Sequence, residues 1–324
     1  MKTRIAIALP LLLAGCASDA ATPEMDPAIE EAFRQQQERE KELAISRSQF
    51  NRILLDLDKM VDSYVFMVNE RGEADTADAV GKIDRFLSQQ VDGSFDVQTQ
   101  QWESGYYDEL VRAADDPTYP GNQSIALAAL GFSTRPETLS VLVNGVENED
   151  FIVSNSAVLG LAVFRDERTP PAVLARCVVE EGRPLSMRSN AAWALFQIQT
   201  ILIDNDDEIV AFWKSLLEQP PLTVDPGILV SAVRGIGLTR DPELTDFVVK
   251  FVSDPTPQVR MAAAIALGRM QNQATYESLL ALLGPAETNA NVRLAARKAL
   301  QALAGGTDRG YDVLGWRLLF DRGG

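Results

Sequence analysis

The segment Arg260-Met261-Ala262-Ala263-Ala264-Ile265-Ala266-Leu267-Gly268 decides the fold, because variants of it return along the chain. Including this one, the aligned segments are Gln123–Gly131, Asn155–Val163, Arg188–Phe196, Leu229–Gly237, Arg260–Gly268 and Arg293–Gln301. Their ends are 32, 33, 41, 31 and 33 residues apart, and the longest interval carries the insertion Glu218–Pro226. Such a period is typical of a stacked array of helical repeats.

Two columns of this alignment contain mostly small side chains. They are Ala126, Val158, Ala191, Ala232, Ala263 and Ala296, and then Ala129, Leu161, Ala194, Gly235, Ala266 and Ala299. Small residues three positions apart share one helix face and allow a neighbouring helix to approach closely. These columns therefore predict that each repeat stacks on the next through this face.

A second amphipathic stretch follows each segment after a turn. We expect second helices over Pro136–Glu147, Pro170–Glu180, Asp207–Glu218, Pro242–Ser253 and Ala274–Leu283. Proline at the first turn and acids beside it suit a helix N-terminus. The predicted unit is a helix–turn–helix of about 32 residues.

The stretch Pro257–Gly268, followed by Tyr276–Leu283, resembles the HEAT-like repeat in its short bacterial, phycobilin-lyase-type form, and Val292–Leu300 matches it again. The resemblance covers Tyr119–Phe320 and implies an all-α fold, a right-handed α-solenoid of about six HEAT-like helix pairs. It does not imply lyase activity, because function does not follow from a widespread fold.

The tail Gly305–Arg317 is similar to the closing segment of bacterial HEAT-repeat proteins. By this resemblance, Trp316 is expected to cap the exposed end of the stack. A ligand-binding role for Trp316 is the alternative.

The N-terminus resembles a bacterial lipoprotein signal peptide. Lys2 and Arg4 precede an apolar run that is too short to span a bilayer permanently. Leu13-Ala14-Gly15-Cys16 resembles the lipobox, which implies that residues 1–15 are removed and that Cys16 receives acyl chains, palmitate among them. No Asp stands beside Cys16, and in this the sequence resembles Gram-negative lipoproteins that are anchored in the outer membrane and face the periplasm. A plain secretory signal is the alternative.

The expected organisation has four parts. Residues 1–15 form the signal peptide, residues 16–25 a lipidated tether, residues 26–118 an N-terminal helical stalk or cap region, and residues 119–324 the repeat array with its Trp cap. Within the N-terminal region, the polar run Gln35–Glu42 predicts a solvated stalk. Apolar spacing predicts helices from Phe50 to Gly72, over Ala74–Gln90 and over Trp102–Ala114.

The composition excludes several classes of site. The chain has no histidine and two cysteines, which argues against His-dependent catalysis and against Cys- or His-rich metal centres. The formal net charge of −16 argues against nucleic-acid binding. We therefore assign no catalytic, cofactor-binding or metal-binding residues, and expect that the protein is not an enzyme.

Three groups of residues have a structural and a functional interpretation. Cys177 is expected to be a buried hydrophobe, or else a reactive thiol. Asp204-x-Asp206-x-Glu208 mimics the start of a calcium loop but suits helix capping better, because Ile209 replaces the turn glycine. Arg188, Arg260 and Arg293 share a column and are expected to pair with acids such as Asp254 between repeats rather than to bind an anion.

These observations favour a membrane-tethered scaffold in the cell envelope that binds protein partners through a groove lined by the second helices. An acidic groove would prefer a basic partner. A carboxylate- or cofactor-dependent envelope enzyme, lyase-like, and a structural subunit of an envelope assembly are the alternatives.

Overall fold

The computed structural model describes Arg34, Gln98, Asp204 and residues 49–68, 74–96, 101–202, 206–220 and 223–323. The chain divides into two compact units, Met1–Gln49 and Phe50–Gly324. The expected signal peptide, Cys16, the tether and the polar stalk lie outside the described residues. Among the residues that are described, no helix is both long and apolar enough to cross a membrane.

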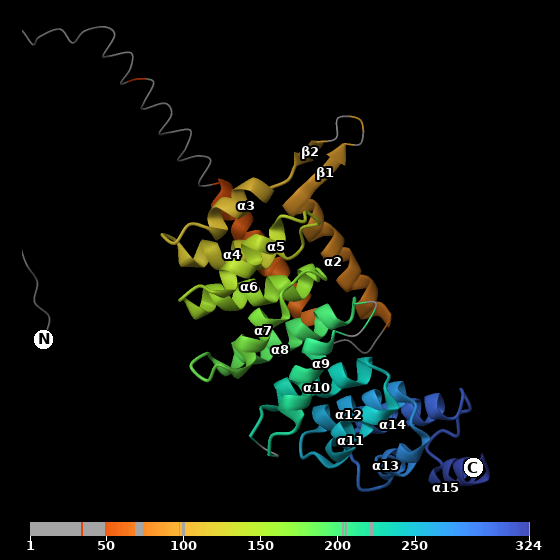
Figure 1. Ribbon diagram of the computed structural model, residues 1–324. Helices are drawn as coiled ribbons and strands as arrows, with labels where there is room; N and C mark the ends of the chain where they lie inside the picture. Colours follow the sequence, from red (N-terminus) through yellow and green to blue (C-terminus); the bar gives the residue numbers. More distant parts are fainter. Residues whose placement is uncertain are drawn as a thin grey trace, which may run out of the picture. The chain divides into compact units, whose positions relative to one another are not determined.

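The unit Phe50–Gly324 is dominated by helices that alternate between the first and second member of each repeat (Figure 1). The first helices are α4 (Pro120–Leu130), α6 (Phe151–Phe164), α8 (Leu185–Gln199), α10 (Pro226–Leu238), α12 (Pro257–Met270) and α14 (Ala290–Leu303). The second helices are α5 (Thr138–Val146), α7 (Pro171–Val179), α9 (Asp207–Leu217), α11 (Thr245–Val249) and α13 (Tyr276–Ala281). Short 3₁₀ turns flank the last two: η1 (Pro242–Leu244), η2 (Lys250–Ser253) and η3 (Gln273–Thr275).

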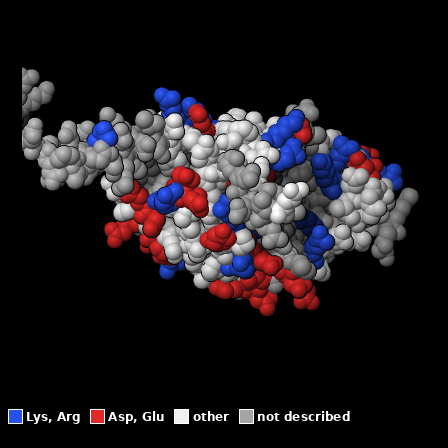
Figure 2. All heavy atoms as spheres, turned by 90° about the horizontal axis from the view of Figure 1, so that it is seen from above, with Lys and Arg blue, Asp and Glu red and all other residues white. Residues whose placement is uncertain are grey.

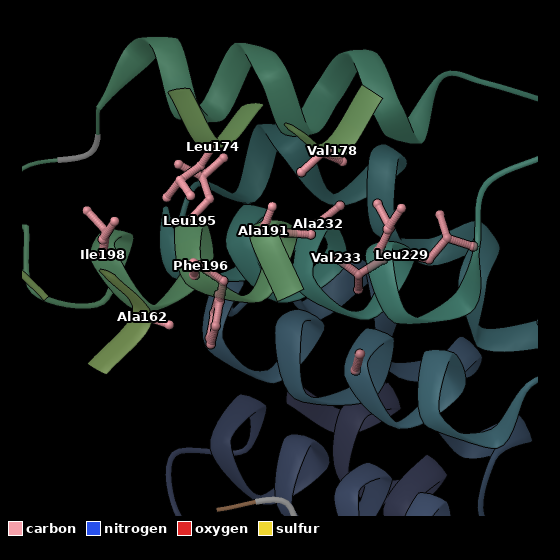
Figure 3. Close-up of a cluster of buried hydrophobic side chains, with 14 of the residues drawn as sticks. Ala162, Leu174, Val178, Ala191, Leu195, Phe196, Ile198, Leu229, Ala232 and Val233 are labelled. Atoms are coloured by element: carbon pink, nitrogen blue, oxygen red, sulfur yellow. The ribbon is translucent and has the colours of Figure 1, made fainter. Parts of the chain in front are cut away.

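Packing follows the repeat order. Each first helix packs on the first helix of the next repeat, and each second helix packs mainly on the first helix that follows it. Figure 3 shows this second contact, with Leu174 of α7 pointing toward Leu195 of α8. Cys177 is fully buried in α7, and burial raises the pKa of its thiol, so it behaves as a small core residue. The predicted α-solenoid is confirmed.

Contact between successive first helices depends on the absence of side-chain bulk. A Cβ atom added at Gly237 would lie 2.6 Å from the Cβ of Ala266, and one added at Gly268 would lie 2.8 Å from the Cα of Ala299. Both distances are below the 3.0 Å that real Cβ contacts respect. These helices therefore approach to a distance that only glycine facing alanine permits.

The alignment predicted for the second repeat is one residue too late. A Cβ added at Gly131 would meet the Cα of Gly160 at 2.7 Å, so Gly160 takes the place that the alignment gave to Leu161. Ser154, not Asn155, donates a hydrogen bond to the last carbonyl of the preceding helix, at Val146. The repeated segment is thus 154–162, and both small-residue columns consist entirely of alanine and glycine.

The region before the repeats is partly β-structured, which corrects one prediction. Residues 49–68 are helical, and α2 (Ala74–Asp92) agrees with the expected second helix. The expected helix over Trp102–Ala114 is wrong in its first part, because β1 (Gly93–Asp96) and β2 (Gln101–Ser104) form an antiparallel hairpin and α3 spans Tyr107–Ala114. A Cβ added at Gly105 would overlap the carbonyl carbon of Asp92. Only glycine therefore allows the hairpin to return to the end of α2.

Two contacts join residues 49–68 to the first repeat. The Asn122 side-chain amide, near the start of α4, donates to Asn51 Oδ1 at 3.4 Å. The Tyr64 ring meets the Phe132 ring edge-on after the end of α4, with the centroids 4.9 Å apart. The apolar face predicted in this helix thus buries against the repeats, as expected.

Asp92 fastens α2 to the first turn of the array. Its side chain is 1% exposed and accepts hydrogen bonds from Ser133 Oγ (2.7 Å), Thr134 N (2.5 Å) and Thr134 Oγ1 (2.8 Å). The Arg135 guanidinium donates to the Asp92 carbonyl and stacks over the Tyr107 ring. This buried carboxylate therefore has a structural role, because a buried charge is costly unless hydrogen bonds or an ion pair compensate it.

The far end of the array is closed by α15 (Val313–Gly323), which packs on α13. Trp316 is fully buried, and its indole N–H donates to the Gly310 carbonyl at 2.9 Å. Tyr276 stacks on Phe320 beside it. Trp316 is therefore a cap residue, as predicted, and is not presented to a ligand.

Replacing Gly237 with alanine is expected to lower the free energy of unfolding by about 2 kcal/mol, because the new methyl group overlaps Ala266. Urea denaturation followed by circular dichroism measures the change. Gly121→Ala is the matched control, since it lies in helix α4 with nothing within 4 Å of the added Cβ. That variant is expected to match or exceed wild-type stability. Equal effects at both positions would contradict the packing argument.

Candidate functional site

The arginine column holds neighbouring segments together. Arg188 Nε donates to the Val178 carbonyl at 2.8 Å, at the end of the preceding helix. Arg260 binds the Asp254 carbonyl at 2.7 Å and both carboxylate oxygens of Glu287, at 2.6 and 3.0 Å. The expected inter-repeat pairing is found, but the carboxylate is that of Glu287 rather than Asp254. Glu287 was missed because its loop carries no repeat signal.

Arg293 departs from this pattern. Its guanidinium lies over the Tyr311 ring, 5.0 Å from the centroid, instead of binding a helix end. Tyr311 belongs to the tail that leads into α15, so the last arginine of the column contacts the cap. Arg188 and Arg260 thus bind groups of neighbouring segments, whereas Arg293 stacks on an aromatic ring.

The calcium-like sequence caps a helix. Asp206 Oδ1 accepts the backbone N–H groups of Glu208 and Ile209 at the start of α9. Within the part of the chain that the structure describes, no group of three or more acidic or cysteine residues is arranged to hold a metal ion.

A groove of about 360 Å³ lies between residues 49–68 and α2. Its lining is mainly apolar and includes Ile53, Met60 and Phe86. Asp58, on the same helix, has a pKa raised by burial and by the nearby Asp62, but it is not among the lining residues. The groove fits an apolar side chain, and its lining contains no pair of carboxylates for acid–base chemistry.

Large apolar side chains are exposed at one edge of three consecutive repeats. They begin or precede the first helices α4, α6 and α8, or end α7: Tyr119, Phe151, Ile152, Val179 and Leu185. Their exposed fractions run from 43% at Phe151 to 70% at Ile152. We call these five residues, together with the charged side chains of residues 115–119, 147–152 and 176–185, the first-helix edge.

The first-helix edge is continuous across repeats. Phe151 and Leu185 hold the same repeat position, three residues before Ser154 and Arg188, on adjacent helices α6 and α8. Packed helices lie about 8–10 Å apart, so the two side chains are neighbours. The Arg176–Glu147 ion pair links α7 to the end of α5, and Arg183 Nη1 donates to Ser154 Oγ at 3.0 Å. These bonds fix the loops that present the apolar residues.

The same edge is strongly acidic. Its three segments carry seven carboxylates against two arginines, a formal net charge of −5: Asp115, Asp116, Glu147, Glu149, Asp150, Glu180 and Glu181. Asp150 also caps α6 through Ile152 N. Figure 2 shows that acidic side chains on the viewed face gather in groups, with a large one along a margin. An exposed apolar patch in an acidic setting is typical of a surface that binds a partner.

The second helices present a different surface from the one expected. Among large apolar residues of α5, α7, α9, α11 and α13, only Val179 is exposed. Exposed large apolar side chains are therefore more numerous at the first-helix edge than along the second helices. The repeat alignment missed this edge because its residues precede the repeated segment.

Comparison with known proteins supports the repeat assignment. Residues 211–301 match the family model of HEAT repeats, which confirms the predicted repeats there. A search of the curated proteins gives no match.

Several solved structures are similar to this chain. A designed armadillo repeat protein in complex with the peptide (KR)4 has 17% identity and a TM-score of 0.45, over 60% of this chain and 98% of that chain. The complex of CpcE and CpcF of phycocyanin lyase from Nostoc sp. PCC7120 has 18% identity and a TM-score of 0.40, over 79% and 92%. Human deoxyhypusine hydroxylase in complex with glycerol has 16% identity and a TM-score of 0.34, over 78% and 98%. At these values no activity or partner transfers to this chain.

Glu287→Gln is expected to destabilise the protein by about 2 kcal/mol at pH 7, because a buried, charge-assisted hydrogen-bond pair is broken. The Arg260 guanidinium holds the pKa of Glu287 below its usual range. The contribution of the Glu287–Arg260 pair to the free energy of unfolding is therefore complete above the unfolded-state pKa of glutamate, about 4.3. It is lost as the pH falls through the lower pKa of Glu287 in the folded protein. Urea unfolding of both proteins at pH 7 and pH 3 should show the difference shrinking in acid.

Glu277→Gln is the control for this measurement. Its ion pair with Arg317 is about half exposed on both sides, so a much smaller change is expected. A pH-independent effect of Glu287→Gln would contradict the ion-pair role.

Proposed function

We propose that this protein is a lipid-anchored scaffold of the bacterial cell envelope whose repeat array binds a partner protein through the first-helix edge. The observation that carries the proposal is the group of exposed apolar side chains in acidic surroundings at one edge of consecutive repeats, with Phe151 and Leu185 at the same repeat position. Repeats display such residues at a regular spacing, which suits an extended polypeptide ligand.

The chemistry of the edge selects the partner. Phe151, Ile152 and Leu185 need apolar side chains to cover them, and a net charge of −5 attracts lysine and arginine. The partner segment is therefore both apolar and basic. A second copy would bring the same acidic edge, and an anionic lipid surface would be repelled, so both fit less well.

The tether is the second part of the proposal. It is supported by the resemblance of residues 1–16 to a lipoprotein leader, with Cys16 as the lipid attachment residue. Each buried CH₂ of an acyl chain adds about 0.8 kcal/mol, so several chains anchor the protein durably. The anchor would hold the array at the outer membrane, facing the periplasm. The proposed role is binding, with no catalytic step and no cofactor.

Photo-crosslinking amino acids at Ile152 and at Leu185 are expected to capture a small, reproducible set of envelope proteins in intact cells, identified by mass spectrometry. Both side chains are exposed, so the substitutions preserve the core. Crosslinkers at Ser140 of α5 and Ser215 of α9, exposed positions on second helices, are the controls. Ile152→Glu combined with Phe151→Ser should abolish capture at Leu185 while the circular dichroism spectrum stays unchanged. Capture mainly from the control positions, or only of the protein itself, would overturn the proposed surface.

Cys16→Ser is expected to move the protein from the membrane fraction to the soluble envelope fraction, because the thiol that receives the acyl chains is lost. Metabolic labelling with a palmitate analogue measures lipidation directly. Cys177→Ser is the matched control, since that buried cysteine is not available for acylation. Unchanged labelling in Cys16→Ser would exclude this anchor.

A further inference from the structure

Two arginines that have no ion-pair partner among the described residues lie near the C-terminal ends of the adjacent first helices α10 and α12. Arg240 follows the end of α10 in a left-handed conformation, with φ of 55°. Arg269 lies in the last turn of α12, which packs directly on α10. Neither side chain forms a hydrogen bond or ion pair within the described residues, although the chain as a whole carries 46 acids against 30 bases.

The Arg269 guanidinium is in an unfavourable environment. Its Nη1 atom is buried and has no hydrogen-bond partner in the described part of the chain. Burial, and then the positive charge of Arg240, lower the pKa of Arg269. An arginine nevertheless stays protonated near neutral pH. A buried N–H group of a charged side chain without an acceptor costs free energy that a bound anion would recover.

We propose that Arg240 and Arg269 form a receptor for the carboxylate of a small molecule that also carries an apolar group. The planar guanidinium donates two parallel hydrogen bonds, which match the two oxygens of a carboxylate. Arg269 supplies the buried donor, and the exposed Arg240 contributes the second positive charge. The site joins two neighbouring repeats, so ligand binding would link α10 to α12.

The surroundings favour a monoanion with an apolar body. Ile265, one turn before Arg269 on α12, and Leu238, at the end of α10, are half-buried on this side. Asp241 and Glu243 lie just beyond Arg240 in the chain, and with the net charge of −16 they repel a dianion more strongly than a monoanion. A carboxylate is therefore favoured over inorganic phosphate.

This site is separate from the first-helix edge. Helix α10 has 13 residues and α12 has 14, so their two ends lie about 20 Å apart at 1.5 Å per residue. Arg240 and Arg269 occupy the C-terminal ends, whereas the first-helix edge lies at N-terminal ends of earlier repeats. Binding here does not depend on the proposed protein partner.

NMR titration of the purified protein, observing the arginine side-chain Nε–H signals, tests the proposal with N-acetyl-leucine as the probe. The Arg240 and Arg269 signals should shift and saturate together, with one dissociation constant. N-acetyl-leucine amide, which lacks the charge, should produce no saturable shift. Inorganic phosphate at the same ionic strength should bind at least about threefold more weakly.

Arg269→Gln should weaken N-acetyl-leucine binding by about tenfold or more, and Arg269→Lys should weaken it less. Arg309→Gln is the matched control, because Arg309 is exposed and its side chain also makes no hydrogen bond or ion pair within the described residues. Circular dichroism and urea unfolding verify that each variant is folded. Equal shifts with the amide, tighter binding of phosphate, an unchanged affinity in Arg269→Gln or no saturable binding at all would each overturn the assignment.

Discussion

The structure of the array depends on the close approach of consecutive first helices at alanine and glycine. Where Gly237 meets Ala266 and Gly268 meets Ala299, no Cβ can be added without overlap. This approach sets the spacing of the repeats, and the remaining contacts follow from it. The arginine column reaches the preceding helix end only because the helices lie at this distance. The first-helix edge is likewise continuous because the N-termini of parallel helices are brought together.

Charge has two different roles in this molecule. In the interior of the described part of the chain, the buried carboxylates have several partners: Asp92, before the repeats, binds Ser133 and Thr134, and Glu287 binds Arg260. Such groups hold segments in register and are not available for chemistry. At the surface, many carboxylates lie in the loops before the first helices, where they cap helix N-termini and set the sign of the local potential. The acidic side chains thus contribute to the architecture and give the loops before the first helices a negative potential.

The sequence predicted the array well, because a repeat reports its own period and the small side chains that its packing requires. Its errors have local causes. The second repeat was aligned one residue late because Ser154-Asn155-Ser156 offers two similar polar starts and only contacts decide between them. A helix was predicted where the β-hairpin lies because the aromatic spacing around Trp102 fits the period of a helix as well as that of a strand. The close approach of Gly105 to Asp92, which only glycine permits, is visible only in the folded structure. The nearness of Arg240 and Arg269 was not predicted, because these residues are 29 positions apart and lie outside the repeated segment.

The packing of every second helix on the first helix of the next repeat gives the array a direction. A second helix such as α7 cannot bury Leu174 and Cys177 until α8 exists. During synthesis, the growing end therefore always carries one helix whose apolar face is uncovered, and folding lags translation by half a repeat. The last second helix has α14 beside it, and α15 covers its remaining side with Phe320 on Tyr276. Burial of this last second helix is thus complete only once α15 has formed, and a chain cut short within any repeat would expose a helix whose apolar face is uncovered.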